Sequence, residues 1–262
     1  MSVEVTRGDS PIVLGLPHTG TYVPPDIMAQ LNATGQTLAD TDWHIHRLYD
    51  GLLKGATTVR ATFHRYVIDA NRPPDGASLY PGQNTTGLVP LTDFDGLPIW
   101  SQPPTPEQIA ARRDQFHAPY HAALRAELDR VRAIHGTAIL YDCHSIRSDI
   151  PFLFDGILPD FNIGTADGTS CDPRIEEATR SICEASTRST VVNGRFKGGW
   201  TTRHYGCPGD GVHAIQMELA QSTHLESETL PFAYSEAKAA TLRPVLSEIL
   251  HRLAELVAEL NR

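Results

Sequence analysis

Features of membrane proteins and of nucleic-acid-binding proteins are missing from this sequence of 262 residues. No apolar run approaches the ~18 residues that a membrane-spanning helix needs, and the longest near the start is Ile12–Leu16. Residues 1–10 contain no apolar segment typical of a secretory signal. Positive charge is scarce, because 22 Lys and Arg stand against 31 Asp and Glu, a net charge of −9. We therefore expect a cytoplasmic protein that binds neither a membrane nor a nucleic acid.

Cysteine is scarce as well. Cys143, Cys171, Cys183 and Cys207 lie far apart and form no C-x-x-C pair, which argues against a disulfide framework and against a structural zinc knuckle. The G-x-S-x-G motif of many serine hydrolases is also absent. Hydrophobic residues, by contrast, make up 40% of the chain, too many for a disordered protein. Twelve histidines are many for so acidic a chain and justify a search for a metal site.

Segments typical of strands and helices alternate along the chain without a repeat. The alternation predicts one α/β domain over residues 1–262, with a mixed, mainly parallel sheet flanked by helices. The polar stretch 71–104 is far longer than a usual connection, so we expect it to be functional. Pro244 could interrupt the last helix, and no oligomeric state is predicted. The predicted strands are 12–16, 56–62, 66–68, 137–141, 189–192 and 213–219, and the predicted helices are 41–54, 105–134, 175–187 and 233–260.

Residues that can bind a metal or carry a proton accompany three of these strands. His18 follows the first strand, Asp142 and His144 follow the strand that ends at position 141, and Glu218 lies within the last strand. Ligands of open α/β sheets bind beyond the carboxyl ends of strands, so we expect these side chains to meet. If the strand continues through position 144, its alternation places Asp142 and His144 on one face and Cys143 on the other. Cys143 is then a packing residue rather than a catalytic one.

Neutral imidazoles and one carboxylate, with a fourth position open to water, form a common hydrolytic zinc centre. His18 and His144 are good candidates because each sits where a strand gives way to polar residues. Either histidine taken alone is more often structural than metal-binding. The pair therefore needs support from other residues.

Two other histidine pairs are weaker candidates for metal ligands. His117 and His121 are four residues apart, but Pro119 lies between them and no Glu stands at position 118, so the H-E-x-x-H motif fails. His44 and His46 are two residues apart on a predicted helix and cannot face the same ligand. We expect these four to be solvated or to support residues of a site.

Five segments of the chain carry a family resemblance. They are L-P-H-T-G at 16–20, D-T-D-W at 40–43, R-Y-V-I-D-A-N-R at 65–72, D-C-H-S-I-R at 142–147 and H-A-I-Q-M-E at 213–218. Together they resemble the N-formylglutamate amidohydrolase (N-formylglutamate deformylase) family, whose members release formate and L-glutamate in histidine degradation. The resemblance runs in order from about position 12 to the C-terminal helix. The family is related to the zinc carboxypeptidases, aspartoacylase and succinylglutamate desuccinylase, so the resemblance implies a zinc-carboxypeptidase-like fold.

The resemblance implies roles for individual residues. His18 matches the first zinc histidine and His144 the later one. Glu218 resembles the glutamate that acts as general base and acid toward the water activated by zinc. Asn71 and Arg72 match an Asn-Arg pair that grips a substrate carboxylate in the aspartoacylase branch.

The second metal ligand departs from the pattern of those relatives. They take it from an H-x-x-E motif, whereas position 21 here is Thr. A carboxylate must come from elsewhere, and we choose Asp42, with Asp40 as the alternative. Asp42 could equally be an acid that complements the dipole of a helix N-terminus. The predicted ligands of one divalent ion, zinc first, are thus His18, Asp42 and His144.

Arginines are expected to bind the dicarboxylate substrate, because a protein of net charge −9 repels it unless local cations attract it. The planar guanidinium group binds a carboxylate bidentately. Arg72 is the choice for the α-carboxylate and Arg147 for the side-chain carboxylate, while Arg65 and Arg203 could equally be surface residues. His204 could be a second acid, an oxyanion donor or a plain loop histidine.

The sequence therefore predicts a metal-dependent enzyme that hydrolyses N-formyl-L-glutamate. One alternative is a hydrolase of another N-acyl amino acid or a carboxypeptidase-like peptidase on the same scaffold. A different class of alternative is a protein that binds a metal or a small molecule without catalysis. Glu218 distinguishes the classes, because storage of a metal needs no base beside it.

Overall fold

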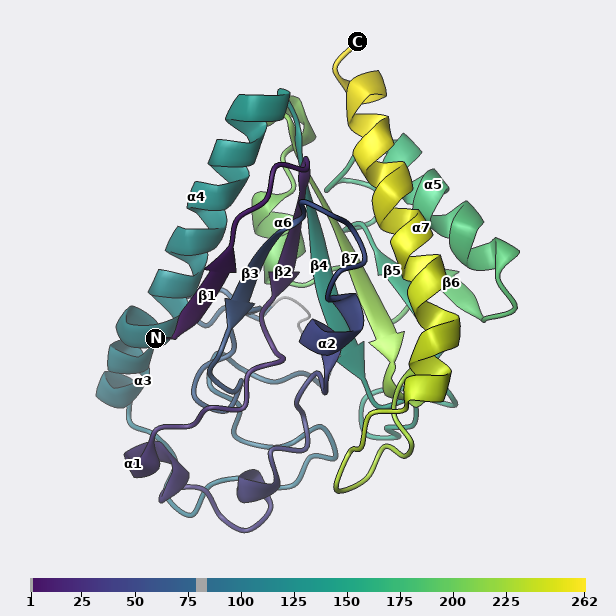
Figure 1. Ribbon diagram of the computed structural model, residues 1–262. Helices are drawn as coiled ribbons and strands as arrows, with labels where there is room; N and C mark the ends of the chain where they lie inside the picture. Colours follow the sequence, from purple (N-terminus) through teal and green to yellow (C-terminus); the bar gives the residue numbers. More distant parts are fainter. Residues whose placement is uncertain (1, 79–83) are drawn as a thin grey trace.

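A seven-stranded mixed sheet runs through the computed structural model, which describes residues 2–78 and 84–262 (Figure 1). The strand order is β1-β3-β2-β4-β7-β5-β6. β2, β3, β4 and β7 run parallel, whereas β1 and β5 pair antiparallel with β3 and β7. The predicted mixed, mainly parallel sheet is confirmed. The strands are β1 (Val3–Thr6), β2 (Ile12–Leu16), β3 (Thr57–Ala61), β4 (Ala138–Ile146), β5 (Phe161–Gly164), β6 (Thr190–Val192) and β7 (Val212–Ala220).

Helices cover both faces of this sheet (Figure 1). α3, a π-helical turn and α4 pack on one face, and α5 and α7 pack on the other. The short helix α6 lies on the α4 side, where its Tyr205 shares a hydrophobic cluster with Tyr120 of α4. The helices are α1 (Pro25–Met28), α2 (Ile45–Tyr49), α3 (Pro106–Arg112), the π-helical turn (Arg113–His117), α4 (Ala118–His135), α5 (Pro173–Ala185), α6 (Trp200–Tyr205) and α7 (Glu236–Leu260).

The central strands β4 and β7 are buried along their whole length. Tyr141 and Cys143 face the α5–α7 side and belong to its hydrophobic cluster, so the expectation that Cys143 is a packing residue is confirmed. Leu140 faces the α4 side, and the alternation places Asp142 and His144 on that same side. On this face, the C-terminal half of β4 therefore carries polar side chains.

β4 is longer than predicted and continues to Ile146 rather than ending at position 141. The polar residues Asp142, His144 and Ser145 are typical of a loop. They pair with β7 nonetheless, with His144 opposite Glu218 in the parallel register. Because both strands continue, the side chains of His144 and Glu218 lie together at the carboxyl ends of β4 and β7.

Several other predicted elements differ from the structure. The helix predicted over 41–54 is only α2, because His44 adopts a left-handed φ of 60° directly before it. Residues 66–68 form part of a buried turn, in which Val67 N donates to His64 O at 2.9 Å, and not a strand. α7 passes through Pro244 without ending. Proline removes one helical hydrogen bond, and the buried apolar face of α7 compensates for that loss.

The helix predicted over 105–134 contains the π-helical turn directly before Pro119. Proline offers no N–H to the carbonyl four residues earlier and crowds it. A wider turn at this place accommodates the ring. At its start, Thr105 and Gln108 exchange the hydrogen bonds of a capping box, which stabilises the first turn.

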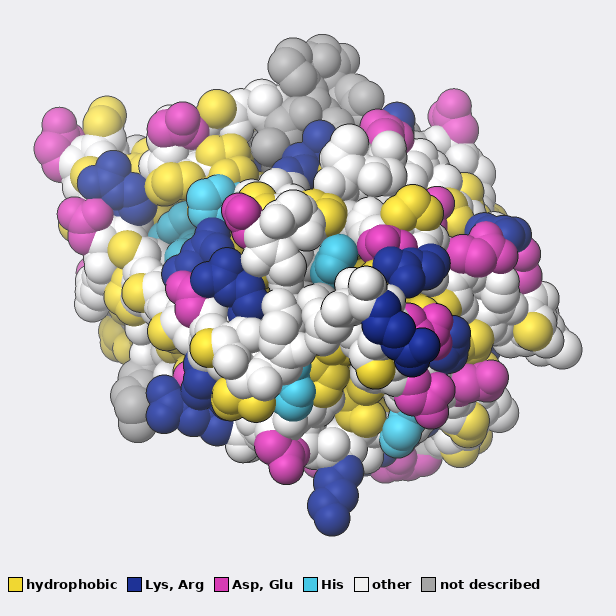
Figure 2. Space-filling model, turned by 90° about the horizontal axis from the view of Figure 1, so that it is seen from above, with side chains coloured by type: hydrophobic (Ala, Val, Ile, Leu, Met, Phe, Trp, Pro, Cys, Tyr) yellow, Lys and Arg dark blue, Asp and Glu magenta, His cyan; other side chains and the backbone are white. Residues whose placement is uncertain are grey.

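The surface shows charges of both signs. On the face seen from the top of Figure 1, dark blue and magenta side chains are interspersed with apolar ones (Figure 2). An even mixture produces no strong field of one sign on that face. In the part of the chain that the structure describes, no helix combines the length and the apolar character needed to cross a membrane.

Candidate active site

A cavity opens at the carboxyl ends of β2, β4 and β7. His18, His144, Gln216 and Glu218 line its inner part. Three arginines also line it, together with an apolar wall. The arginines are Arg65, Arg72 and Arg195, and the apolar side chains are Phe94, Ile146, Leu153 and Phe196.

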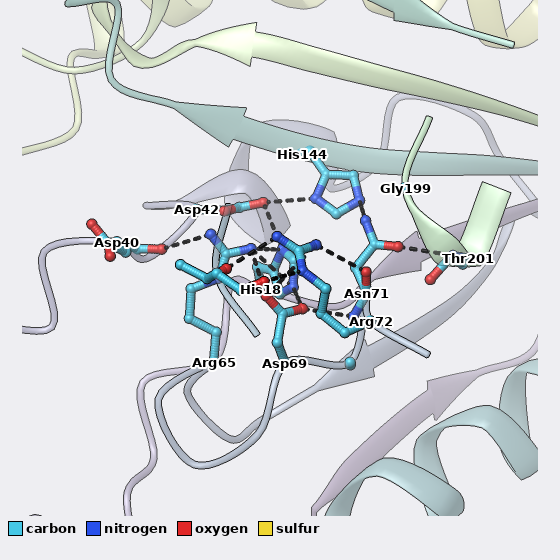
Figure 3. Close-up of polar contacts among 12 residues, drawn as sticks. His18, Asp40, Asp42, Arg65, Asp69, Asn71, Arg72, His144, Gly199 and Thr201 are labelled. Carbon is cyan, nitrogen blue, oxygen red and sulfur yellow. Dashed lines mark hydrogen bonds and ion pairs between the residues drawn. The ribbon is translucent and has the colours of Figure 1, made fainter. Parts of the chain in front are cut away.

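The predicted metal ligands His18, Asp42 and His144 lie together at this cavity (Figure 3). All three are buried, and one donor atom of each lies within 4.8 Å of the other two. Asp42 Oδ2 is 3.1 Å from His144 Nδ1 and 3.8 Å from His18 Nδ1. The loop before α2 holds Asp42 in place through a hydrogen bond from Asp42 N to His18 O of 3.0 Å.

The other ring nitrogen of each histidine faces a second buried carboxylate. His18 Nε2 is 2.7 Å from Asp69 Oδ1, and His144 Nε2 is 3.2 Å from Asp142 Oδ1. A carboxylate on the far nitrogen is typical of metal-binding histidines, because it fixes the tautomer and the orientation of the ring. Two imidazoles and one carboxylate in a dry environment are also donors that zinc prefers. The residues present therefore fit a divalent metal ion.

Arg65 lies against the His18 ring and contacts its Nδ1 (Figure 3). Burial, with the charge of Arg65 second, lowers the pKa of His18, so this imidazole is neutral, the form that binds metals. Burial opposes protonation of His144 too. The charges of Asp142 and Asp42 nevertheless raise the pKa of His144.

Glu218 faces His144 across the β4–β7 register and lines the cavity. Gln216 Nε2 donates to Glu218 Oε2 at 3.1 Å, and Gln216 Oε1 accepts from Gly199 N at 2.8 Å. Burial, opposed by the charge of His144, raises the pKa of Glu218 to about 8. A carboxyl group with such a pKa can take up and release a proton near neutral pH.

Asn71 and Arg72 reach the same cavity from the start of the long loop. Asn71 Nδ2 is 3.2 Å from His144 Nε2, and Asn71 Oδ1 accepts from Thr201 N at 2.8 Å (Figure 3). Gly199 allows this approach, because a Cβ at that position would lie 2.2 Å from Asn71 Nδ2. Glycine is thus required at position 199 by close packing.

His117 of the π-helical turn and His121 of α4 support this loop from behind. His121 Nε2 is 2.8 Å from Ala70 O, and His117 Nε2 is 3.0 Å from Arg72 O. They hold the backbone on both sides of Asn71. Both are buried and lie outside the metal group, as expected for supporting residues.

The remaining candidates take other positions. His44 Nε2 lies 2.9 Å from Phe232 O, and His46 Nδ1 lies 2.6 Å from Thr19 Oγ1. Asp40 accepts a hydrogen bond from Phe94 N at 3.0 Å and does not join the metal group of the described residues. The ring of His204 stacks on Trp200, 4.4 Å between centroids, and does not line the described cavity.

Two of the predicted substrate arginines do not reach the cavity wall that the described residues form. Arg147 Nη2 donates to Asp95 Oδ2 at 2.7 Å, and Arg203 Nε donates to Gly198 O at 2.9 Å. The predicted Arg65 and Arg72 do line the cavity, and a further arginine of its wall, Arg195, was missed by sequence reasoning. It follows the edge strand β6, and no local pattern connects it to the distant histidines. Gln216, also missed, could have been found from its alternation with Glu218.

The arrangement suits hydrolysis of an acyl bond. A metal group stands beside a carboxyl group with a raised pKa, which provides a place for a water nucleophile and a proton carrier. Cationic side chains on the cavity wall attract an anionic substrate. The combination matches the chemistry expected of an amidohydrolase.

Comparison with known proteins gives consistent matches. The sequence profile described as N-formylglutamate amidohydrolase matches residues 10–225. An N-formylglutamate deformylase of Pseudomonas putida is 48% identical over 97% of this chain and 96% of its own length. An N-formylglutamate deformylase of Pseudomonas aeruginosa is 47% identical over 94% of each chain.

Solved structures agree with the sequence matches. The crystal structure of N-formylglutamate amidohydrolase from Ralstonia eutropha JMP134 superimposes with a TM-score of 0.84 at 25% identity, covering 98% of both chains. A gene product from Agrobacterium tumefaciens shares the fold, with a TM-score of 0.74 at 19% identity over 98% of this chain and 96% of that one.

Proposed function

Since this chain belongs to the N-formylglutamate amidohydrolase family, we propose that it hydrolyses N-formyl-L-glutamate to formate and L-glutamate. The observation that carries the proposal is the placement of Glu218 beside the group of His18, Asp42 and His144 in a cavity that arginines line. The four cysteines form no disulfide, which supports the further proposal that the enzyme works in the cytoplasm.

The metal ion, zinc first, would be held by His18, Asp42 and His144. When bound, such an ion polarises a carbonyl group and makes a water molecule more acidic. The support for this assignment is the donor chemistry and the carboxylates behind both histidines. Dialysis against a chelator is expected to abolish formate release, and addition of zinc to restore it. Full activity of a metal-free preparation would contradict the assignment.

Glu218 carries the proton in the proposed reaction. Its carboxylate takes a proton from water while the water oxygen bonds to the formyl carbon. It then gives this proton to the amide nitrogen as the carbon–nitrogen bond breaks, and the second proton of the water passes from the new carboxyl group to the amine, so that formate and L-glutamate with a protonated amino group leave. Asn71 and Arg72, held from behind by α4, orient the substrate for this step.

Glu218→Gln tests this role. The amide has nearly the same shape but cannot accept and return the proton, so formate release should fall by ~10²-fold or more. Zinc content and substrate binding should stay as in the parent protein. A variant that turns over like the parent would remove Glu218 from the mechanism, and loss of zinc would point to a ligand role instead.

A second candidate is the hydrolysis of a longer N-acyl amino acid. The apolar residues Phe94, Ile146, Leu153 and Phe196 on the cavity wall favour it, because a formyl group needs almost no apolar space. Comparing kcat/KM for N-formylglutamate and N-acetylglutamate distinguishes the two. We expect a preference for the formyl compound, and a preference for the acetyl compound would establish the second candidate.

A further inference from the structure

We propose that Arg195 binds the side-chain carboxylate of the substrate, the role for which the sequence favours Arg147. This inference rests on the proposed function and extends it to substrate selection. Arg195 lies three residues after β6 and lines the same cavity as Glu218 and His144. Arg147 instead contacts the exposed Asp95.

The guanidinium group of Arg195 is held at the cavity wall by defined contacts. Nε donates to Leu153 O at 3.0 Å, and Nη2 donates to Asn84 O at 3.1 Å. Its central carbon lies 5.4 Å from the centre of the Phe196 ring. A planar cation held in this way loses little conformational freedom when a carboxylate binds.

Arg72 is held in the same manner by the same loop segment. Its Nε donates to Thr86 O at 2.9 Å, and its Nη2 donates to Thr86 Oγ1 at 3.0 Å. Arg72 and Arg195 thus contact residues 86 and 84, which are two apart in the chain. Consecutive Cα atoms are 3.8 Å apart, so these residues are separated by at most about 7 Å.

Two guanidinium groups on the wall of one cavity, both held by the same loop segment, suit a dicarboxylate substrate. Four carbon–carbon bonds of ~1.5 Å separate the two carboxyl carbons of glutamate, which places them about 5 Å apart when extended. One carboxylate at Arg72 and the other at Arg195 would leave the formyl amide free to face His144 and Glu218. A substrate without the second carboxylate would lose one of these contacts.

The third arginine of the cavity wall belongs to its inner part. Arg65 contacts the His18 ring, and its Nη2 is 3.7 Å from Asp69 Oδ2. Its charge is thus compensated where the metal group lies. Near Arg195, the half-buried apolar side chains of Leu153 and Phe196 lower the local polarity, which strengthens a charge-assisted hydrogen bond. These surroundings favour Arg195 over Arg65 as the second carboxylate receptor.

The test measures kcat/KM of Arg195→Met on two substrates, N-formylglutamate and N-formylglutamine, which differ only in the distal carboxylate. We expect a loss of ~10²-fold for N-formylglutamate and less than ~5-fold for N-formylglutamine. Arg195→Lys should recover part of the preference for N-formylglutamate over N-formylglutamine, because lysine restores the positive charge but cannot bind a carboxylate bidentately. Arg188→Met, at the other end of β6, is the matched control and should keep the parent preference.

Equal losses on both substrates would overturn the proposal, since a merely structural Arg195 would affect both through Leu153 and Asn84. Unchanged kinetics would overturn it as well. Calorimetric titration with L-glutamate and L-glutamine gives a readout without turnover, in which Arg195→Met should lose the preference for glutamate. If the parent protein released no formate from N-formylglutamate, the proposed function would fail, while this titration would still decide the role of Arg195.

Discussion

Asp69→Asn should weaken metal binding without removing any metal ligand. Asp69 is fully buried, and its Oδ1 lies 2.7 Å from His18 Nε2 while accepting a hydrogen bond from Asn71 N at 2.8 Å. Asparagine keeps an oxygen acceptor but loses the negative charge that makes His18 a stronger donor. Loss of such an outer carboxylate typically costs 10–100-fold in metal affinity, or about 1.4–2.7 kcal/mol.

The charge around Asp69 adds a second effect. Burial raises the pKa of Asp69, but the neighbouring imidazole of His18 and the guanidinium groups of Arg72 and Arg65, whose Nη2 lies 3.7 Å from Asp69 Oδ2, hold it well below its usual range. The carboxylate is therefore ionised. Its neutralisation leaves the buried Arg65 with less compensation and should lower the free energy of unfolding by ~1–3 kcal/mol.

The assay is competition for zinc with a chromophoric chelator at neutral pH, with urea denaturation of the same samples. The matched control is Asp40→Asn, because Asp40 is equally buried but contacts Phe94 N rather than the histidines. The control should lose stability and keep its zinc affinity within about twofold. Parent-like zinc affinity in Asp69→Asn would refute the reasoning, as would equal losses of affinity in both variants.

Three further results are expected. Asp42→Asn should bind zinc far more weakly than Asp40→Asn in the same competition assay, since only Asp42 lies within the metal group; the reverse order would make Asp40 the ligand. His121→Leu should raise KM because Ala70 O loses its donor at the substrate loop, and His121→Gln should restore part of it; parent-like KM in both would exclude a positioning role. Burial lowers the pKa of His121 to about 3 and of His224 to about 4, so they stay neutral in the folded state while the unfolded chain takes up protons below pH 6.5. Their contribution to stability is complete above pH 6.5 and is lost as the pH falls, by about 3 kcal/mol in total at pH 5.5. Urea denaturation from pH 7.5 to 5.5 measures the total loss of stability, to which the buried His64 also contributes, and His121→Gln should reduce that loss by about 1.4 kcal/mol; a parent-like loss in that variant would contradict the assignment.

Much of the sheet could be predicted because its signals are local. The apolar run Ile12–Leu16 and the segments around positions 138 and 213 indicate buried strands by composition alone. The alternation along β4 was enough to place Cys143 in the core and His144 on the other face. Composition was not enough at 66–68, where an apolar segment is buried in a turn and Val67 N donates to His64 O.

The candidate site also has a part that the sequence predicts and a part that only the tertiary structure decides. Which residues can bind a metal or carry a proton follows in part from their chemistry and their position on a strand or just after one, so His18, His144 and Glu218 could be named from the sequence. Asp42 was chosen only through the family resemblance, with Asp40 as the alternative. Which partner each charged group meets is decided by groups far apart in the chain. The exposed Asp95 draws Arg147 away from the cavity, and the course of the chain after β6 brings Arg195 to it. Hydrophobic alternation depends on residues that are close in the sequence. An ion pair depends on the distance between two charged groups, which is set only once the strands have assembled.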